Sequence, residues 1–174
     1  MKSSTVKVRP ETVEDIPGIR LVNEGAFPTR SEADLVDLCR ARNKHVLSLV
    51  AVEQGLVVGH ILFTPVTLDP PHPGWHGLGL GPVAVLPEHQ GRGIGSRLIL
   101  MGLELGRTQG YDYVVLLGNP RYYTRFGFIP AREFGLSSDY GDGDEFQARE
   151  LNPGVLRGAR GVVKYVGEFS EVGC

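Results

Sequence analysis

The feature that most constrains the fold of this chain is a glycine-rich turn between an apolar segment and a long amphipathic one. The apolar segment is Leu78–Leu86, and the turn Gln90–Ser96 has the sequence QGRGIGS. From Gly93 to about Gln109 apolar residues recur at helical spacing, and a β-rich run, Tyr111–Leu117, follows. A strand, a turn, a helix and a strand in this order form a βαβ unit, whose strands are parallel neighbours. We therefore predict a fold that contains a parallel strand pair.

The other segments indicate that the remaining strands pair mainly antiparallel. Val46–Val52 and Val57–Phe63 are β-rich runs with Glu53-Gln54-Gly55 between them, which is typical of a hairpin. Helices are expected over Val13–Val22 and from a capping Ser31 to Cys39. The other expected elements are a strand over 6–9, a loop over 69–77, a short helix over 121–126, strands over 128–131 and 161–166, and a surface loop over 135–149. The pattern predicts an α/β (α+β) fold with a mixed, mainly antiparallel sheet and about four helices.

Size and composition favour a single domain over residues 1–174. The chain has 174 residues, 41% of them hydrophobic and 22% charged, which suits one sizeable core. A formal net charge of −2 and a pI near 6.2 argue against a surface built for nucleic acid. We therefore expect no nucleic-acid partner.

Cysteine usage and the N-terminus bear on the compartment. Cys39 and Cys174 are too few for a disulfide framework or a four-thiol zinc cluster. The first nine residues lack the apolar core of a signal peptide, and no stretch reaches the ~18 apolar residues of a membrane span. We expect a cytoplasmic protein with no membrane partner.

The glycine-rich turn has the chemistry of an anion site. Backbone N–H groups at the start of a helix bind phosphate by hydrogen bonds and through the helix dipole, and Arg92 could add charge. Glycines that serve only a tight turn are the alternative. The turn is not a P-loop, because Ser96 and Arg97 follow Gly95, and Leu98 stands where a dinucleotide motif has glycine or alanine. A phosphate-bearing ligand of another class is implied.

Two linked motifs resemble those of the GCN5-related N-acetyltransferase (GNAT) family, and the resemblance covers nearly the whole chain. Val83–Gly95 is similar to the family's central motif, an apolar-Ala-Val strand end followed by Gln/Arg-x-x-Gly-x-Gly/Ala. Asn119, Tyr122–Tyr123 and Gly127–Phe128 resemble its further signature, an Asn, an aromatic-Tyr pair and Gly-Phe. The resemblance implies one acyl-CoA N-acyltransferase domain, with acetyl-CoA as its co-substrate.

The resemblance assigns coenzyme A to the turn and to the strand before it. The pyrophosphate would lie on the turn amides, and the pantetheine arm would pair with the strand backbone where a bulge splays the parallel strands. Gly79, Gly81 and Pro82 supply a physical means for such a bulge. The cofactor-binding residues implied are Val83, Val85, Gln90, Gly91, Arg92, Gly93, Gly95, Ser96 and Asn119.

The resemblance also implies that Tyr123 is the general acid. A phenol with a pKa of ~10 stays protonated at neutral pH and can donate to a departing thiolate, whose thiol has a pKa of ~8.5 if it resembles cysteine. A backbone N–H near Val85 would meet the developing oxyanion. Packing among Tyr122, Phe126 and Phe128 is the alternative role of Tyr123.

No residue stands out as a general base or as a metal ligand. The strand 78–85 contains neither Glu nor His, and the candidates elsewhere are His60, His72, His76, Glu24 and Glu32. His72 and His76 are four apart, but a proline and a glycine between them prevent a helix that would align them. We expect no metal, and an acceptor amine with a pKa of ~7.7–8.0 would need little help from a base.

The predicted function is acetyl transfer from acetyl-CoA to a primary amine of an unidentified small molecule or peptide. The amine would attack directly in a ternary complex. A non-catalytic acyl-CoA-binding sensor and a transferase for longer acyl groups are the alternatives. The acceptor would contact the loops over 26–31, 69–77 and 135–149. Exposed edge strands leave a homodimer open.

Overall fold

A computed structural model describes residues 4–174, which form a mixed nine-stranded sheet with helices. The strands are β1 (Lys7–Pro10), β2 (Leu47–Glu53), β3 (Leu56–Asp69), β4 (Gly77–Val85), β5 (Tyr113–Leu117), β6 (Ile129–Pro130), β7 (Leu136–Ser138), β8 (Phe146–Glu150) and β9 (Gly161–Lys164). The α-helices are α1 (Ile16–Ala26), α2 (Ser31–Ala41), α3 (Ile94–Thr108), α4 (Pro120–Tyr123) and α5 (Glu168–Val172). The strand order is β1-β2-β3-β4-β5-β8-β6, with β9 paired to β3 and to β7.

The predicted fold class and the parallel strand pair are confirmed. β4 pairs parallel to β5 from Gly77↔Tyr113 to Gly79↔Val115, so Gly81–Val85 lies past the end of this pairing. Gly81 has a φ of +145°, a backbone conformation that favours glycine. The pairs β1–β2, β2–β3, β5–β8 and β6–β8 are antiparallel, while β7–β9 is a second parallel pair that the sequence did not indicate.

Two compact units make up the described chain. The first contains the described residues up to Phe63, together with Gly81–Gly102 and Gly167–Cys174. The second contains Thr64–Leu80 and Leu103–Val166. Each of β3, β4 and α3 supplies residues to both units. The expectation that residues 1–174 form one domain stays a prediction.

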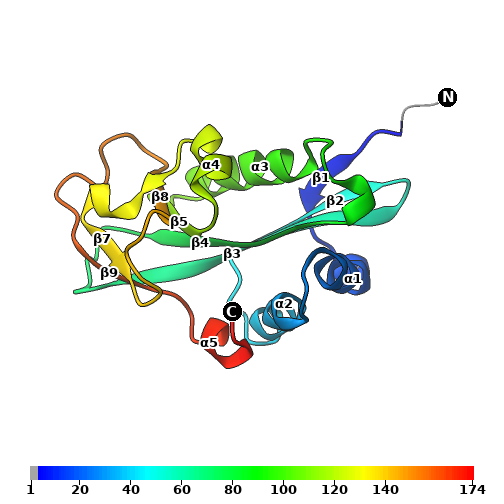
Figure 1. Cartoon of the computed structure of the whole chain (residues 1–174), viewed down its shortest axis with the longest axis horizontal. Helices are drawn as coiled ribbons and strands as arrows, with labels where there is room; N and C mark the ends of the chain where they lie inside the picture. Colours follow the sequence, from blue (N-terminus) through cyan, green and yellow to red (C-terminus); the bar gives the residue numbers. More distant parts are fainter. Residues whose placement is uncertain (1–3) are drawn as a thin grey trace. The chain divides into compact units, whose positions relative to one another are not determined.

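In the first unit, α1 and α2 lie on one face of β1–β3 and α3 lies on the other (Figure 1). A Cβ on Gly18 of α1 would meet Val57 of β3 at 2.9 Å, and one on Gly59 would meet Ile94 and Leu98 of α3 at 3.1 Å. Helices on both faces bury the sheet, which explains why β2 reads as an almost unbroken apolar run.

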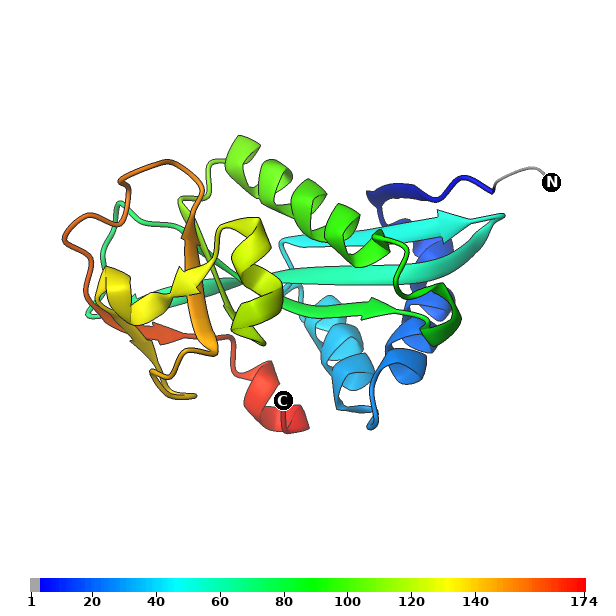
Figure 2. The same cartoon turned by 45° about the horizontal axis from the view of Figure 1, so that its top comes forward.

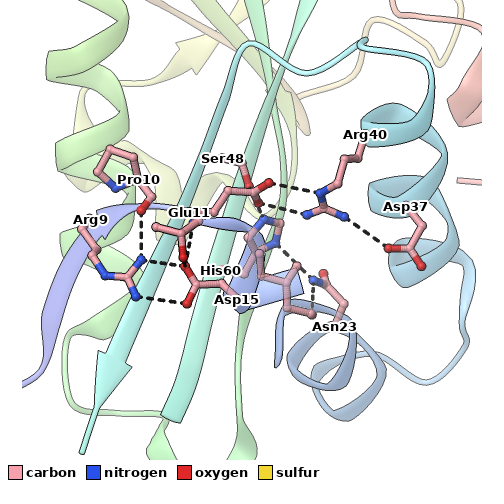
Figure 3. Close-up of polar contacts among 11 residues, drawn as sticks. Arg9, Pro10, Glu11, Asp15, Asn23, Asp37, Arg40, Ser48 and His60 are labelled. Atoms are coloured by element: carbon pink, nitrogen blue, oxygen red, sulfur yellow. Dashed lines mark hydrogen bonds and ion pairs between the residues drawn. The ribbon is translucent and has the colours of Figure 1, made fainter. Parts of the chain in front are cut away.

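A bulge in β3 decides which side chains face which helices. Ala51 pairs with Gly59, but Val52 pairs with Val57, so Val58 is an extra residue. Residues 57 and 59 therefore face opposite sides, although they are two apart. As a consequence, His60 points toward α1 (Figure 3).

In the second unit, β5 pairs with β8, which also pairs with β6. The helix α4, yellow-green in Figure 2, lies next to β6 and β8. The buried cluster of this unit includes Tyr113, Val115, Phe146, Ala148 and Val163. This arrangement attaches the segment after β5 to a packed core.

Two sequence predictions were wrong. The surface loop over 135–149 contains β7 and most of β8, and Phe146, Gln147 and Ala148 are buried. The strand is only five residues long, and a glycine-rich acidic stretch before it hides its pattern. Ser31 is the first residue of α2 rather than its cap, which is Arg30.

Candidate functional site

The predicted phosphate-binding turn lies in the first unit, between β4 and α3. A 3-10 helix, Pro87–His89, precedes it, and Gly91 and Gly93 have positive φ values of +71° and +76°. A Cβ at either glycine would meet nothing within 4 Å. Both glycines therefore keep an open backbone surface that a ligand can approach, in a conformation that side chains disfavour.

The turn leaves backbone donors available. Within residues 4–174, the N–H groups of 91–96 donate no hydrogen bond to the protein. The Arg97 N–H donates a hydrogen bond to the carbonyl of Gly93, the residue before α3, at 3.1 Å. Free donors at the start of a 15-residue helix have the chemistry needed to bind an anion.

Gln90 links the turn to the strand before it. Its Nε2 donates to the Val85 carbonyl at 3.0 Å. Val83 and Val85 are half-buried and alternate with the buried Ala84, so their side chains share one face of β4. The structure thus brings together the predicted residues from Val83 to Ser96.

The side chain of Arg92 already has a partner in the protein. Its Nη1 and Nη2 donate to the two carboxylate oxygens of Glu53, at 3.0 and 2.8 Å. Glu53, at the end of β2, was not singled out in the sequence, because its contact with Arg92 joins residues 39 positions apart. The guanidinium of Arg92 is therefore paired with Glu53 and is not a free group at the turn.

Asn119 and Tyr123 lie in the second unit, on the segment after β5. Asn119 caps α4, since its Oδ1 accepts from the Arg121 N–H at 3.0 Å. Asparagine followed by Pro120 at the first helical position is a common helix start, a signal that the sequence carried. No hydrogen bond among the described residues uses the amide nitrogen of Asn119.

Tyr123 packs among aromatic rings and keeps its hydroxyl free. Its ring makes edge contacts with Tyr122 and Phe128, with centroids 5.0 and 6.0 Å apart. Burial raises the pKa of Tyr123 to about 12. No hydrogen bond among the described residues involves its hydroxyl. Packing and a protonated hydroxyl thus occur together in this residue.

Three residues that sequence reasoning missed position the Tyr123 segment. The Gly118 N–H donates to the Glu145 carbonyl at 2.9 Å, and buried Gln147 donates its Nε2 to the Gly118 carbonyl at 3.1 Å. Arg149 donates its Nη1 to the Phe126 carbonyl at 2.7 Å. Glu145, Gln147 and Arg149 belong to the stretch that the sequence suggested was a loop.

His60, one of the base candidates, is the centre of a buried polar network (Figure 3). Its Nδ1 accepts from the Asn23 amide at 3.1 Å, so Nε2 carries the proton and donates to Ser48 Oγ at 2.8 Å. The Ser48 hydroxyl donates to Glu11, which also accepts from Arg40 at 2.9 and 3.1 Å. Burial lowers the pKa of His60 to about 3. Fully buried and bonded at both nitrogens, His60 is structural and not a base.

The other base candidates are engaged elsewhere or exposed. His72 stacks on Trp75 with ring centroids 3.6 Å apart, and His76 Nδ1 lies 3.7 Å from Asp112. Glu24 forms an ion pair with Arg20 at 3.0 Å. Glu32 is half-buried on α2. None of these contacts identifies a base.

The described residues 4–174 contain no group of three or more His, Cys, Asp or Glu side chains arranged to hold a metal ion. Among them, too, no helix combines the length and the apolar character needed to cross a bilayer.

Comparison with known proteins found a matching family model and similar relatives. The model of the Acetyltransferase (GNAT) family matches residues 16–128. The chain is 34% identical over 166 residues to YhbS of Escherichia coli (strain K12), described as an uncharacterised N-acetyltransferase, covering 94% of this chain and 98% of YhbS.

Two solved structures are similar over the whole fold. The crystal structure of Escherichia coli YhbS in complex with CoA has a TM-score of 0.91 and 32% identity, and the match covers 98% of this chain and 94% of that one. A GNAT family acetyltransferase from Brucella melitensis, in complex with acetyl-CoA, has a TM-score of 0.78 and 38% identity, over 95% and 98% of the chains. Motifs, fold and relatives agree, and the chain belongs to the GNAT family of acetyltransferases.

Proposed function

We propose that this protein transfers the acetyl group of acetyl-CoA to a primary amine of a small molecule or peptide, by direct attack in a ternary complex. The observation that carries the proposal is the run of unbonded N–H groups over 91–96, at the start of a long helix and within the family's central motif. Such a run suits the pyrophosphate of the coenzyme. Relatives that bind CoA and acetyl-CoA support the same assignment.

In this proposal the coenzyme lies along β4 and the turn. The backbone of Val83 and Val85 pairs with the pantetheine arm, and the amides from Gly91 to Ser96 hold the pyrophosphate, with Gln90 closing the turn behind them. Asn119 donates its amide to the coenzyme from the segment after β5. A backbone N–H near Val85 meets the oxyanion that forms at the thioester carbon.

Tyr123 assists the departing sulfur. The amine nitrogen forms a bond to the thioester carbon, the carbon–sulfur bond breaks, and the thiolate takes a proton from Tyr123, which regains one from the acceptor nitrogen. Because its pKa is raised to about 12 by burial, Tyr123 stays protonated and donates a hydrogen bond to sulfur as charge develops. The proton that the acceptor nitrogen loses replaces the one that reaches the sulfur. An α-amine with a pKa of ~7.7–8.0 loses this proton with little help.

The experiment that tests this function combines titration with turnover. Acetyl-CoA is titrated into the protein by calorimetry, and thiol release is followed across a panel of amines and peptides, for wild type, Tyr123→Phe and the neighbouring control Tyr122→Phe. We expect binding, acceptor-dependent thiol release and a roughly 10²-fold lower turnover in Tyr123→Phe only, with unchanged binding.

The same assay separates the alternatives. Binding without turnover on any acceptor would identify a sensor. Faster turnover with propionyl- or butyryl-CoA would identify a transferase for longer acyl groups. No binding of any coenzyme A thioester would refute the proposal.

We also propose that the protein acts in the cytoplasm. Cys39 and Cys174 are free thiols, as expected in a reducing compartment.

A further inference from the structure

A buried carboxylate lies behind the glycine-rich turn. The side chain of Glu53 is 7% exposed. Three groups converge on it: the guanidinium of Arg92, the Ser4 hydroxyl, and His89, whose Nδ1 lies 3.0 Å from Oε2. All four residues belong to the first unit. The cluster therefore connects the end of β2 to both sides of Gln90.

Arg92 is attached in a way that fixes its direction. The two guanidinium nitrogens reach the two carboxylate oxygens at 3.0 and 2.8 Å, the paired geometry that adds orientation to charge. His89 Nδ1 lies 3.0 Å from Arg92 Nη1, so the residues before and within the turn share one anchor. Gly91 and Gly93, with positive φ values, flank Arg92, and glycine has more backbone conformations available than any other residue.

This anchor controls where the turn amides point. Two flanking glycines let the backbone adopt many conformations, and only a fraction of these directs the N–H groups toward one point. A side-chain tether halfway between the glycines removes most of the alternatives before a ligand arrives. Preorganised donors bind more tightly because less ordering remains to be done on binding.

A direct role of Arg92 on phosphate would have a different consequence. Arg92 would have to leave Glu53, and a buried carboxylate would lose its bidentate partner, which is costly. The structure therefore favours an Arg92 that remains paired with Glu53 when phosphate binds.

We propose that Glu53 is a positioning residue for coenzyme binding, which acts by holding Arg92 and His89 so that the amides of the Gly91–Ser96 turn are preorganised for phosphate. The inference rests on the proposed function, since it names how that function's coenzyme site is kept in shape. Glu53 itself contacts no ligand in this proposal.

The first measurement is backbone ¹⁵N relaxation by NMR in the free protein, which needs no ligand. The variants are Glu53→Gln, Arg92→Gln, the double variant, and Glu104→Gln as matched control. Glu104 also pairs with an arginine, at 2.6 Å, but its side chain is 61% exposed. We expect the order parameters of the N–H groups over 91–96 to fall from ~0.85 toward ~0.6 in the first three variants and to keep the wild-type values in the control.

The second measurement is calorimetric titration with CoA at 50 and 500 mM salt. Each single variant should bind about 10-fold more weakly. The double variant should lose no more than either single one, because both changes break one interaction. The fold-loss should be similar at both salt concentrations, since the missing term is order and not charge.

The outcomes that overturn the inference are distinct. Unchanged binding or tighter binding in Glu53→Gln, with a salt-sensitive loss in Arg92→Gln, would make Arg92 a direct phosphate ligand. Lower order parameters throughout the first unit would show that the pair only stabilises the fold. Unchanged order parameters at 91–96 would exclude the tether even if CoA binds. Wild-type protein that binds no CoA would refute the proposed function, while the relaxation data would still test the tether. If Glu53→Gln fails to fold, Arg92→Gln, at an exposed position, carries both tests.

Discussion

Tyr123, the general acid of the proposed function, also has a packing role. The aromatic contacts that suggested a packing role also bury the phenol and raise its pKa to about 12. The two readings of the sequence are therefore not alternatives. A ring held by its neighbours is also a ring whose hydroxyl has a fixed position.

Gly118 makes room for that ring. A Cβ on Gly118 would overlap the Tyr123 ring, so Gly118→Ala should displace it. We expect a loss of ~1–3 kcal/mol in unfolding free energy, from overpacking, together with lower turnover. Thermal unfolding and the thiol-release assay measure both. Gly167→Ala, whose Cβ would meet nothing within 4 Å, is the control, and equal behaviour of the two variants would contradict the prediction.

His60 should make stability depend on pH. Its pKa is about 3 in the folded state, lowered by burial from the usual 6.5, so the unfolded chain takes up this proton at a higher pH than the folded chain does. The stabilisation is complete above pH 6.5 and falls as the pH drops toward 3, by up to ~1.4 kcal/mol per pH unit.

The variant His60→Gln isolates this contribution. Urea unfolding between pH 7 and 4.5 should give a curve for the variant that is flatter than that of wild type, although the variant is less stable at pH 7. Parallel curves would mean that His60 is not the group responsible.

At the scale of elements, β8 positions the segment that carries Tyr123. Gln147 of β8 bonds the Gly118 carbonyl, and Arg149 bonds the Phe126 carbonyl, so both ends of the segment are attached to one strand. Gln147→Leu leaves the Gly118 carbonyl without this partner, and we expect a cost of ~1–3 kcal/mol.

The Gln147 prediction has a local readout. Amide exchange over 118–127 should rise in Gln147→Leu, and turnover should fall more than CoA binding. Gln109→Leu, at an exposed position, should change neither. A loss of stability without faster exchange at 118–127 would show that β8 does not restrain this segment.

At the scale of the whole molecule, two compact units are built from shared elements. Because β3, β4 and α3 each supply residues to both, neither unit can unfold without disrupting an element of the other. We therefore expect one cooperative transition. Fluorescence of Trp75, the only tryptophan, reports on the second unit, whose core it packs against. The midpoint of urea unfolding measured by this fluorescence should coincide with the midpoint measured by far-UV circular dichroism. Separate midpoints would show two domains.

Local pattern was sufficient for the elements that lie close together in the chain. The βαβ unit was predicted from Leu78–Leu86, the glycine-rich turn and the amphipathic segment after it. Asn119-Pro120 is a common start of a helix. The strand β8 was missed because five residues next to a glycine-rich acidic stretch carry too little periodicity. The bulge at Val58, which turns His60 toward α1, leaves no mark in the sequence because it arises from the pairing register.

The sequence alone determined the family and predicted the coenzyme-binding turn and the role of Tyr123, because motifs of glycines, amides and aromatics act over a few neighbouring residues. Only the tertiary structure decided which side chains those motifs meet. It brings Glu53 to Arg92 across 39 residues, buries His60 beside Asn23 across 37, and attaches Gly118 to Gln147 across 29. Contacts over such separations depend on strand register and on helix packing, and no local pattern encodes these.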